Sequence, residues 1–181
     1  MNTNRLKKIA VLGCVVSSLL VTIYGAHAAS FKEVEVQALY IYKILQLVKW
    51  NDVDKTKVVM CSTEDSDDDT VGNAFMKIIS NDADDKAKFS SKLLGLRGEY
   101  DRCDIVFIDK KVVNLDEILF KISNKDIITI SDMKGFSRKG GMFEFYINDD
   151  GKIKVELNYE NLKKADLNVS GRLLEVIKIV K

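Results

Sequence analysis

The sequence is almost without histidine and entirely without proline. Its single histidine, His27, lies within the first 28 residues. If that segment is removed, the remaining chain contains no imidazole, the one side chain whose ordinary pKa lies near neutrality. Ser-His-Asp and Cys-His catalytic arrangements and histidine-ligated zinc are thereby excluded. Pairs of carboxylates, which suffice for most glycoside hydrolysis, are the catalytic chemistry that remains open.

The first 28 residues have the features of an export signal. Basic side chains precede an apolar run over residues 9–23, and Ala26-His27-Ala28 follows with small residues at the first and third positions before a cut. This order is typical of a cleavable signal peptide. We therefore predict a signal peptide over residues 1–28, a mature domain over residues 29–181, and export from the cytoplasm.

Two other interpretations of the leading segment stay open. Its apolar run is shorter than the roughly 20 residues needed to span a bilayer, which argues against an uncleaved membrane anchor. Val11-Leu12-Gly13-Cys14 loosely resembles a lipobox, although only a short apolar stretch precedes Cys14. A cleaved signal peptide accounts for the segment best.

Charge is nearly balanced along the chain. There are 28 basic and 27 acidic residues, and Arg5, Lys7 and Lys8 would leave with the signal peptide. The mature chain would then carry a slight acidic excess, which argues against nucleic acid as a partner. Its length of about 150 residues suits one domain rather than two.

Cysteine is scarce, with three in the chain and one of them, Cys14, in the signal peptide. Two cysteines left in an exported chain suggest one disulfide, Cys61–Cys103, with two free buried thiols as the alternative. A difficulty is that Cys61 ends one predicted strand and Cys103 begins another, whereas a bridge needs Cα atoms within about 7 Å. No metal site is expected from two sulfurs without imidazole.

Apolar periodicity alternates between helical and strand spacing along the mature chain. We predict an α/β fold: a single compact domain with a mixed, partly parallel sheet flanked by helices and a C-terminal β-hairpin. The strand predicted over residues 104–109 is apolar at each position between its two terminal aspartates, as in the centre of a sheet covered on both faces. Helices are predicted over residues 30–50, 71–79, 115–122, 160–165 and 171–180, and strands over 57–61, 88–94, 104–109, 126–131, 142–148 and 152–158.

The predicted hairpin has one apolar face and one polar face. Asn148-Asp149-Asp150-Gly151 supplies the Asp-Gly pair that a tight turn favours. Alternation buries Phe143, Phe145, Ile147, Ile153, Val155 and Leu157, and turns Glu144, Tyr146, Lys154 and Glu156 outward. The outward face is either plain solvated surface or a place for a partner.

Acidic residues gather in two places that we interpret as solvated loops. Residues 64–69 offer carboxylates for calcium, but Thr70 occupies the position where an EF-hand loop needs glycine, and Met76 the position of its bidentate glutamate. The same interpretation covers Asp82, Asp84 and Asp85.

Three further positions have a structural and a functional interpretation. Trp50, at the end of an amphipathic helix, is either a core anchor or a ligand platform. Gly140-Gly141 before a strand indicates a turn with positive φ rather than a phosphate loop, because no helix follows. Asp132 caps or orders the loop after its strand, with catalysis as the alternative.

Several short motifs together resemble one family, the YfiR-like periplasmic regulators, over essentially the whole mature chain. The resemblance is carried by Ala38-Leu39-Tyr40 with Trp50, the strand ending in Cys61, residues 103–108, residues 128–132, Phe136 with Gly140-Gly141, residues 155–158, and Ala165-Asp166-Leu167 with residues 170–174. No single motif is specific to the family, but the order of all of them along the chain is. The family commonly has proline after the tryptophan, where this chain has Asn51, and some members have a second cysteine pair, so a switch based on two bridges is not carried over.

The resemblance implies a periplasmic protein, often a homodimer, that is not an enzyme and needs no cofactor. Such a protein binds the periplasmic region of an inner-membrane diguanylate cyclase and holds it inactive, which limits cyclic di-GMP and biofilm growth. An outer-membrane lipoprotein that sequesters the regulator is a further expected partner.

Contact with a cyclase requires an exposed face with apolar or aromatic anchors among polar groups. We expect Tyr146 and Glu156 on the outer hairpin face, with Leu162 on the next helix, to provide that contact, and Glu156→Lys to weaken binding while leaving the fold intact. The alternatives are a periplasmic small-ligand-binding module and a carboxylate-based enzyme.

Overall fold

The computed structural model describes residues 33–50, 55–64, 69–94, 98–123 and 125–181. The chain divides into two units, Met1–Glu33 and Val34–Lys181, and the described fold belongs to the second. The predicted signal peptide, the start of the first predicted helix and most of the acidic stretch at residues 64–69 lie outside the described residues.

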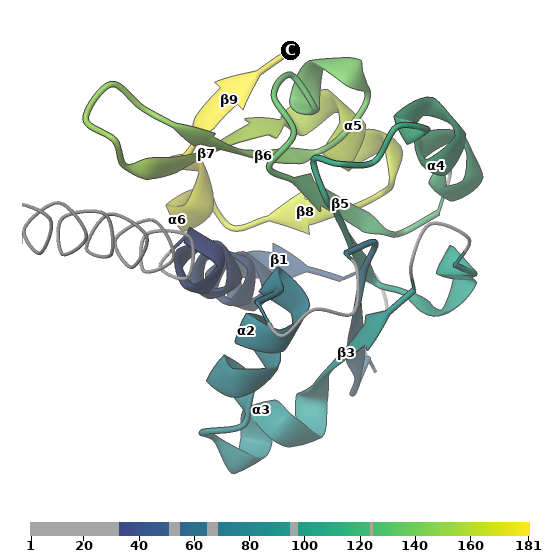
Figure 1. Cartoon of the computed structure of the whole chain (residues 1–181), viewed down its shortest axis with the longest axis vertical. Helices are drawn as coiled ribbons and strands as arrows, with labels where there is room; N and C mark the ends of the chain where they lie inside the picture. The colour runs from purple at the N-terminus through teal and green to yellow at the C-terminus, as the bar shows by residue number, and fades with distance from the viewer. Residues whose placement is uncertain (1–32, 51–54, 65–68, 95–97, 124) are drawn as a thin grey trace, which may run out of the picture. The chain divides into compact units, whose positions relative to one another are not determined.

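A seven-stranded mixed sheet organises Val34–Lys181 (Figure 1). Its strand order is β3-β2-β4-β5-β6-β7-β9, and every neighbouring pair is parallel except the β6–β7 hairpin. The predicted α/β class with a partly parallel sheet is therefore confirmed. The strands are β2 (Val58–Ser62), β3 (Phe89–Leu93), β4 (Ile105–Ile108), β5 (Ile128–Ser131), β6 (Phe143–Ile147), β7 (Ile153–Asn158) and β9 (Lys178–Val180).

Helices connect the strands and cover the sheet. A helix over residues 33–47 leads into β1 (Val48–Lys49), which pairs with β8 (Asn168–Val169) in a separate two-stranded sheet. The remaining helices are α2 (Val71–Ile79), α3 (Ala83–Lys88), α4 (Leu115–Ile122), α5 (Tyr159–Lys164) and α6 (Gly171–Leu174), with short 3₁₀ turns η2 (Tyr100–Arg102) and η3 (Ser137–Lys139). The bounds of α2 and α4 agree with the prediction.

Two predictions of local structure are wrong. The helix expected over residues 171–180 ends at Leu174, and the chain continues as β9, which pairs with β7. The β-branched residues Ile179 and Val180 favour that extended conformation. The acidic stretch at residues 82–85 is not a plain loop, because the Asp82 side chain accepts hydrogen bonds from the backbone of Asp84 and Asp85 and begins α3.

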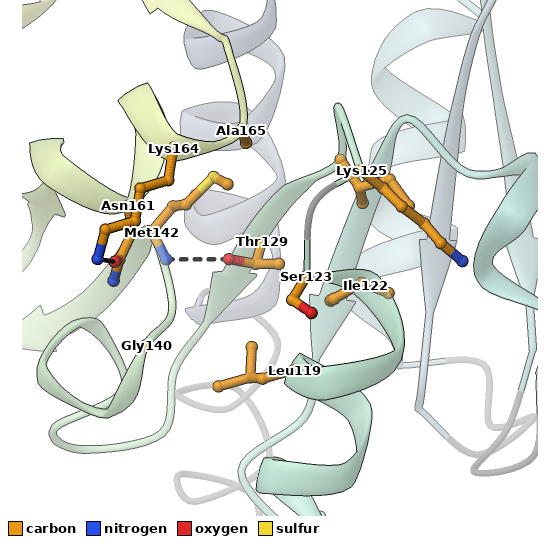
Figure 2. A pocket seen from close by; sticks show the side chains of 11 residues that line it. Leu119, Ile122, Ser123, Lys125, Thr129, Gly140, Met142, Asn161, Lys164 and Ala165 are labelled. Atoms are coloured by element: carbon orange, nitrogen blue, oxygen red, sulfur yellow. Dashed lines mark hydrogen bonds between the residues drawn. The ribbon is translucent and has the colours of Figure 1, made fainter.

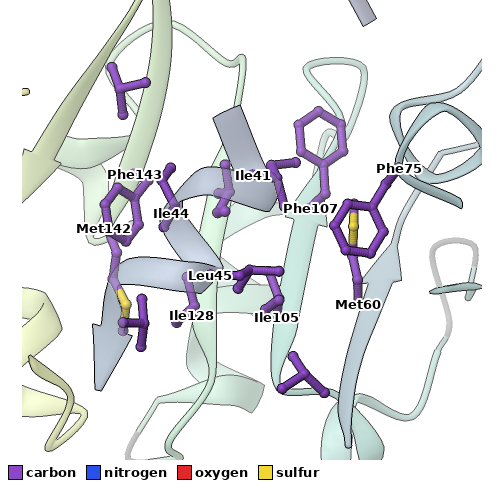
Figure 3. Packing of buried hydrophobic residues seen from close by; sticks show 14 of the residues in the cluster. Ile41, Ile44, Leu45, Met60, Phe75, Ile105, Phe107, Ile128, Met142 and Phe143 are labelled. Carbon is purple, nitrogen blue, oxygen red and sulfur yellow. The ribbon is translucent and has the colours of Figure 1, made fainter. Parts of the chain in front are cut away.

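The central strands are buried because each face of the sheet has its own core. Figure 3 shows Ile41, Ile44 and Leu45 of the first helix lying over strand residues such as Ile105, Phe107 and Phe143. On the other face, Val106 and Ile108 pack with α4 and with the segment around η2. β4 is buried at all four positions, as predicted, although β5 is the middle strand of the seven.

Cys61 and Cys103 are joined in a disulfide, with their Cα atoms 5.8 Å apart. The expected difficulty does not arise, because Cys103 follows η2 and precedes β4 instead of belonging to the strand. The pairing of β2 with β4 begins only at Met60 and Ile105. Both cysteines are buried in the core on the α4 face of the sheet.

No helix among the described residues is both long enough and apolar enough to span a bilayer.

Candidate functional site

The face of the hairpin expected to point outward is largely covered. Glu144 and Glu156 lie opposite each other in the β6–β7 register, and each is only 3% exposed. The turn containing η3 supplies Ser137 and Arg138 to this face, where both contact Glu156. The outward placement predicted for Glu144 and Glu156 is therefore wrong, because strand alternation gives the face of a side chain and not what covers it.

Ser137 links the two buried carboxylates. Its hydroxyl lies 2.9 Å from Oε2 of Glu144 and 2.5 Å from Oε1 of Glu156. Backbone N–H groups of Gly135 and Ser137 also donate to Glu144, at 2.7 and 3.0 Å. Because a serine hydroxyl has one proton and Glu144 already receives two backbone donors, that proton is best used toward Glu156.

Two cations complete the surroundings of Glu156. Arg138 lies 2.9 Å from Oε1 and Lys178 lies 3.1 Å from Oε2. Burial by itself raises the pKa of Glu156, but the hydrogen bonds from Ser137 and Lys178 and the positive charge of Arg138 outweigh burial and lower the pKa below its ordinary value. Glu156 is thus held ionised, and it ties β9 to β7 through Lys178.

The three predicted partner-contact residues do not share one exposed face. Leu162 is fully buried in the core that also contains the first helix, so its expected exposure is wrong. The physical reason is that α5 is amphipathic and turns Leu162 inward. Tyr146 alone remains partly exposed, with the Lys178 ammonium 5.4 Å from its ring centroid.

Other positions singled out in the sequence have structural partners. Lys55 lies 4.5 Å from the Trp50 ring centroid and 2.6 Å from Oδ1 of Asp104. Asp132 accepts a hydrogen bond from the Lys110 backbone and forms an ion pair with the Lys110 ammonium, so it ties the loop after β5 to the loop after β4. Gly140 has φ of +108°, so the turn expected there is confirmed.

Glu64 is the first residue of the acidic stretch at residues 64–69, and its carboxylate is already hydrogen-bonded to the start of α2. Its carboxylate accepts hydrogen bonds from the backbone of Val71 and Gly72 at 2.8 and 3.2 Å, and from the Ser62 hydroxyl at 2.6 Å. A carboxylate is favourable at a helix N-terminus. Within the part of the chain that the structure describes, no three metal-binding side chains come together.

A small pocket lies between α4, β5 and α5 (Figure 2). Its volume is about 140 Å³, below the roughly 300 Å³ at which drug-sized ligand sites begin. The Thr129 hydroxyl at its wall accepts a hydrogen bond from the Met142 backbone at 2.9 Å. The pocket is large enough for a few water molecules, each taking about 30 Å³ in the liquid.

A larger groove runs along the first helix and has a volume of about 500 Å³. The apolar stripe of the helix that packs on the sheet does not by itself predict this groove. The missed signal is a second apolar stripe at helical spacing. The groove is lined by Val36, Leu39, Tyr40, Lys43, Ile44, Leu47, Lys154, Val155, Leu173, Val176 and Ile177.

Comparison with known families identifies the chain. The model of the YfiR/HmsC-like family matches residues 34–177, which include the sheet from β2 to β7 and its helices. The protein therefore belongs to the YfiR/HmsC-like family, a family of periplasmic regulators, and the resemblance predicted from short motifs is confirmed. A search of curated protein sequences found no significant match.

Proposed function

We propose that the protein is a periplasmic regulator that binds the periplasmic sensor region of an inner-membrane diguanylate cyclase and represses cyclic di-GMP synthesis. The observation that carries the proposal is the family match over residues 34–177, which takes in nearly all of the described fold. Repression of the cyclase would limit biofilm formation.

Export is part of the proposal. The order of basic, apolar and small residues over residues 1–28 supports cleavage after Ala28 and release into the periplasm. An oxidising compartment suits the disulfide between Cys61 and Cys103. A second copy of the chain and an outer-membrane lipoprotein are further proposed partners, to be checked by light scattering of the purified protein and by co-purification from membranes.

The function is tested by measuring cyclic di-GMP in cells that lack the gene. Deletion should raise cyclic di-GMP, and a plasmid copy of the full chain should restore the original concentration. A matched copy without residues 1–28 should be made but not exported, and should fail to restore it. Unchanged cyclic di-GMP after deletion, in cells shown to express a diguanylate cyclase with a periplasmic region, would contradict the proposal.

A further inference from the structure

The helix over residues 33–47 has more apolar surface than its own packing uses. One stripe, which includes Ile41 and Leu45, is buried against the sheet. A second stripe runs through Val36, Leu39 and Leu47, and Val36 and Leu39 are 38% and 48% exposed. A helix that covers a sheet on one side is expected to be polar on the other. The second stripe therefore indicates a second packing partner.

The second stripe is one wall of the groove, and the opposite wall is also apolar. Leu173, Val176 and Ile177 form that wall, and Val155 of β7 lies between the two. Val176 is 76% exposed, so large apolar side chains are open to solvent on both sides of the groove. Exposed apolar surface that gathers in one place, instead of being scattered, marks an interaction site.

The wall of the groove that is formed by the helix over residues 33–47 has the geometry to bind another helix. Its contacts recur at residues 36, 39, 43 and 47, the spacing at which one helix packs along another. These positions extend over roughly 16 Å of the helix axis, about three turns. An occupant of matching length would place three or four apolar side chains in the groove.

The charge of the groove selects among occupants. Lys43 and Lys154 are the charged residues that line it, and no carboxylate does. Across the described ranges, neither lysine has an acidic side chain in ion-pair distance. A second copy packed on this face by a two-fold axis would bring the lysines of both copies into one interface, where like charges repel.

We propose that the groove between residues 36–47 and 173–177 binds an amphipathic helix of another protein, whose apolar stripe is flanked by Asp or Glu. This inference rests on the proposed function, under which that helix belongs to the periplasmic region of the cyclase. Apolar side chains of the helix fill the groove, and its carboxylates pair with Lys43 and Lys154.

The test is a titration of the full mature chain with the purified periplasmic region of the cyclase. Leu39→Glu and Val176→Glu place a charge among the apolar contacts and should weaken binding at least about tenfold, as expected at the centre of an interface. Lys43→Glu with Lys154→Glu should weaken binding and reverse its dependence on salt, because the new glutamates repel the carboxylates of the helix and salt screens that repulsion. Phe120→Glu on α4, at a side chain that is 81% exposed, and the pair Lys57→Glu with Lys92→Glu are matched controls that should bind as the original protein does.

Two synthetic peptides separate the groove from the identity of the partner. Each has roughly 18 residues, long enough to form a helix, with leucine at helical spacing and either glutamate or lysine beside it. The glutamate peptide should bind about tenfold more tightly than the lysine peptide, and Leu39→Glu should remove its binding.

The outcomes are distinct. If the cyclase region binds equally well to the original protein and to all groove variants, the groove inference is wrong while the proposed function stands. If the cyclase region does not bind but the glutamate peptide does, the proposed partner is wrong and the groove chemistry stands. Equal binding of the two peptides, or of neither, overturns the inference.

Discussion

Glu144 and Glu156 face each other across the β6–β7 hairpin, both buried, with the hydroxyl of Ser137 between their carboxylates. Like charges directly opposite in a sheet are destabilising unless they are compensated. Here backbone N–H groups of the turn around η3 donate hydrogen bonds to the Glu144 carboxylate. Arg138 and Lys178 form ion pairs with the Glu156 carboxylate. The pair therefore fastens the turn and β9 to the hairpin, and this role is structural.

Glu156→Gln should destabilise the fold. The substitution removes a buried negative charge that receives three hydrogen bonds, while Arg138 and Lys178 are half-exposed and can be solvated. We expect a loss of about 1–3 kcal/mol in the free energy of unfolding, measured by urea denaturation. Glu160→Gln at an exposed position of α5 is the control and should change little. Glu156→Lys, which we expected from the sequence to leave the fold intact, should instead be more destabilising, because it places a third cation beside Arg138 and Lys178.

The ion pairs of Glu156 should make the free energy of unfolding fall at acidic pH. The pKa of this group is lowered from 4.5 in the folded chain, so the unfolded chain takes up a proton first as pH falls. The stabilisation is present above about pH 4.5 and is lost as pH falls through the lower folded pKa. The difference in the free energy of unfolding between the original protein and Glu156→Gln should therefore begin to shrink as pH falls below about 4.5, and shrink further as pH falls through the folded pKa. A difference that stays constant down to pH 3 would contradict the assignment.

The disulfide should contribute strongly to stability. In the chain-entropy model, joining two cysteines that are 42 positions apart in the sequence stabilises a fold by roughly 4 kcal/mol. The double variant Cys61→Ala with Cys103→Ala should lose a comparable amount in denaturant titrations. Protein purified from the periplasm should show no thiol that reacts with a maleimide after unfolding, until a reductant is added. Two reactive thiols in unreduced protein would rule out the bridge.

The two adjacent glycines of the turn before β6, Gly140 and Gly141, should tolerate substitution by alanine less well than Gly171 does. Gly140 has φ of +108°, and a Cβ on Gly141 would lie 2.1 Å from Cε1 of the buried Phe136. Gly140→Ala should cost about 1 kcal/mol or more, and Gly141→Ala should cost more because Phe136 must move. Gly171 at the start of α6 has no atom within 4 Å of an added Cβ, so Gly171→Ala is the matched control and should be nearly neutral. Thermal unfolding of the three variants measures the difference.

Sequence reasoning succeeded where local pattern decides the structure. Ile105 to Ile108 reads as a strand covered on both faces, and the Asp-Gly turn sets the hairpin register that pairs Phe145 with Val155. It failed where distant segments decide. Alternation alone could not reveal that a turn nine residues earlier covers Glu144, or that β9 brings Lys178 to Glu156.

The groove shows a different limit of sequence reasoning. Its first wall was present in the pattern, since Val36, Leu39 and Leu47 lie at helical spacing. The second wall depends on where the chain goes after Leu174, and there the predicted helix was wrong. A long apolar helix with two stripes is therefore a signal to look for a second partner, although the sequence does not say which segment forms the other side.

The two edges of the large sheet should open differently, because only one of them lies within the loop that the disulfide closes. The loop between Cys61 and Cys103 contains α2, α3 and the edge strand β3, so the ends of this third of the fold stay joined even when its hydrogen bonds break. The opposite edge, β7 with β9, is held by noncovalent contacts alone, because a chain with three cysteines forms no second internal bridge. Backbone amides of β9 should therefore exchange with solvent deuterium earliest among the strands of the large sheet, and a partner seated in the groove beside them would slow that exchange.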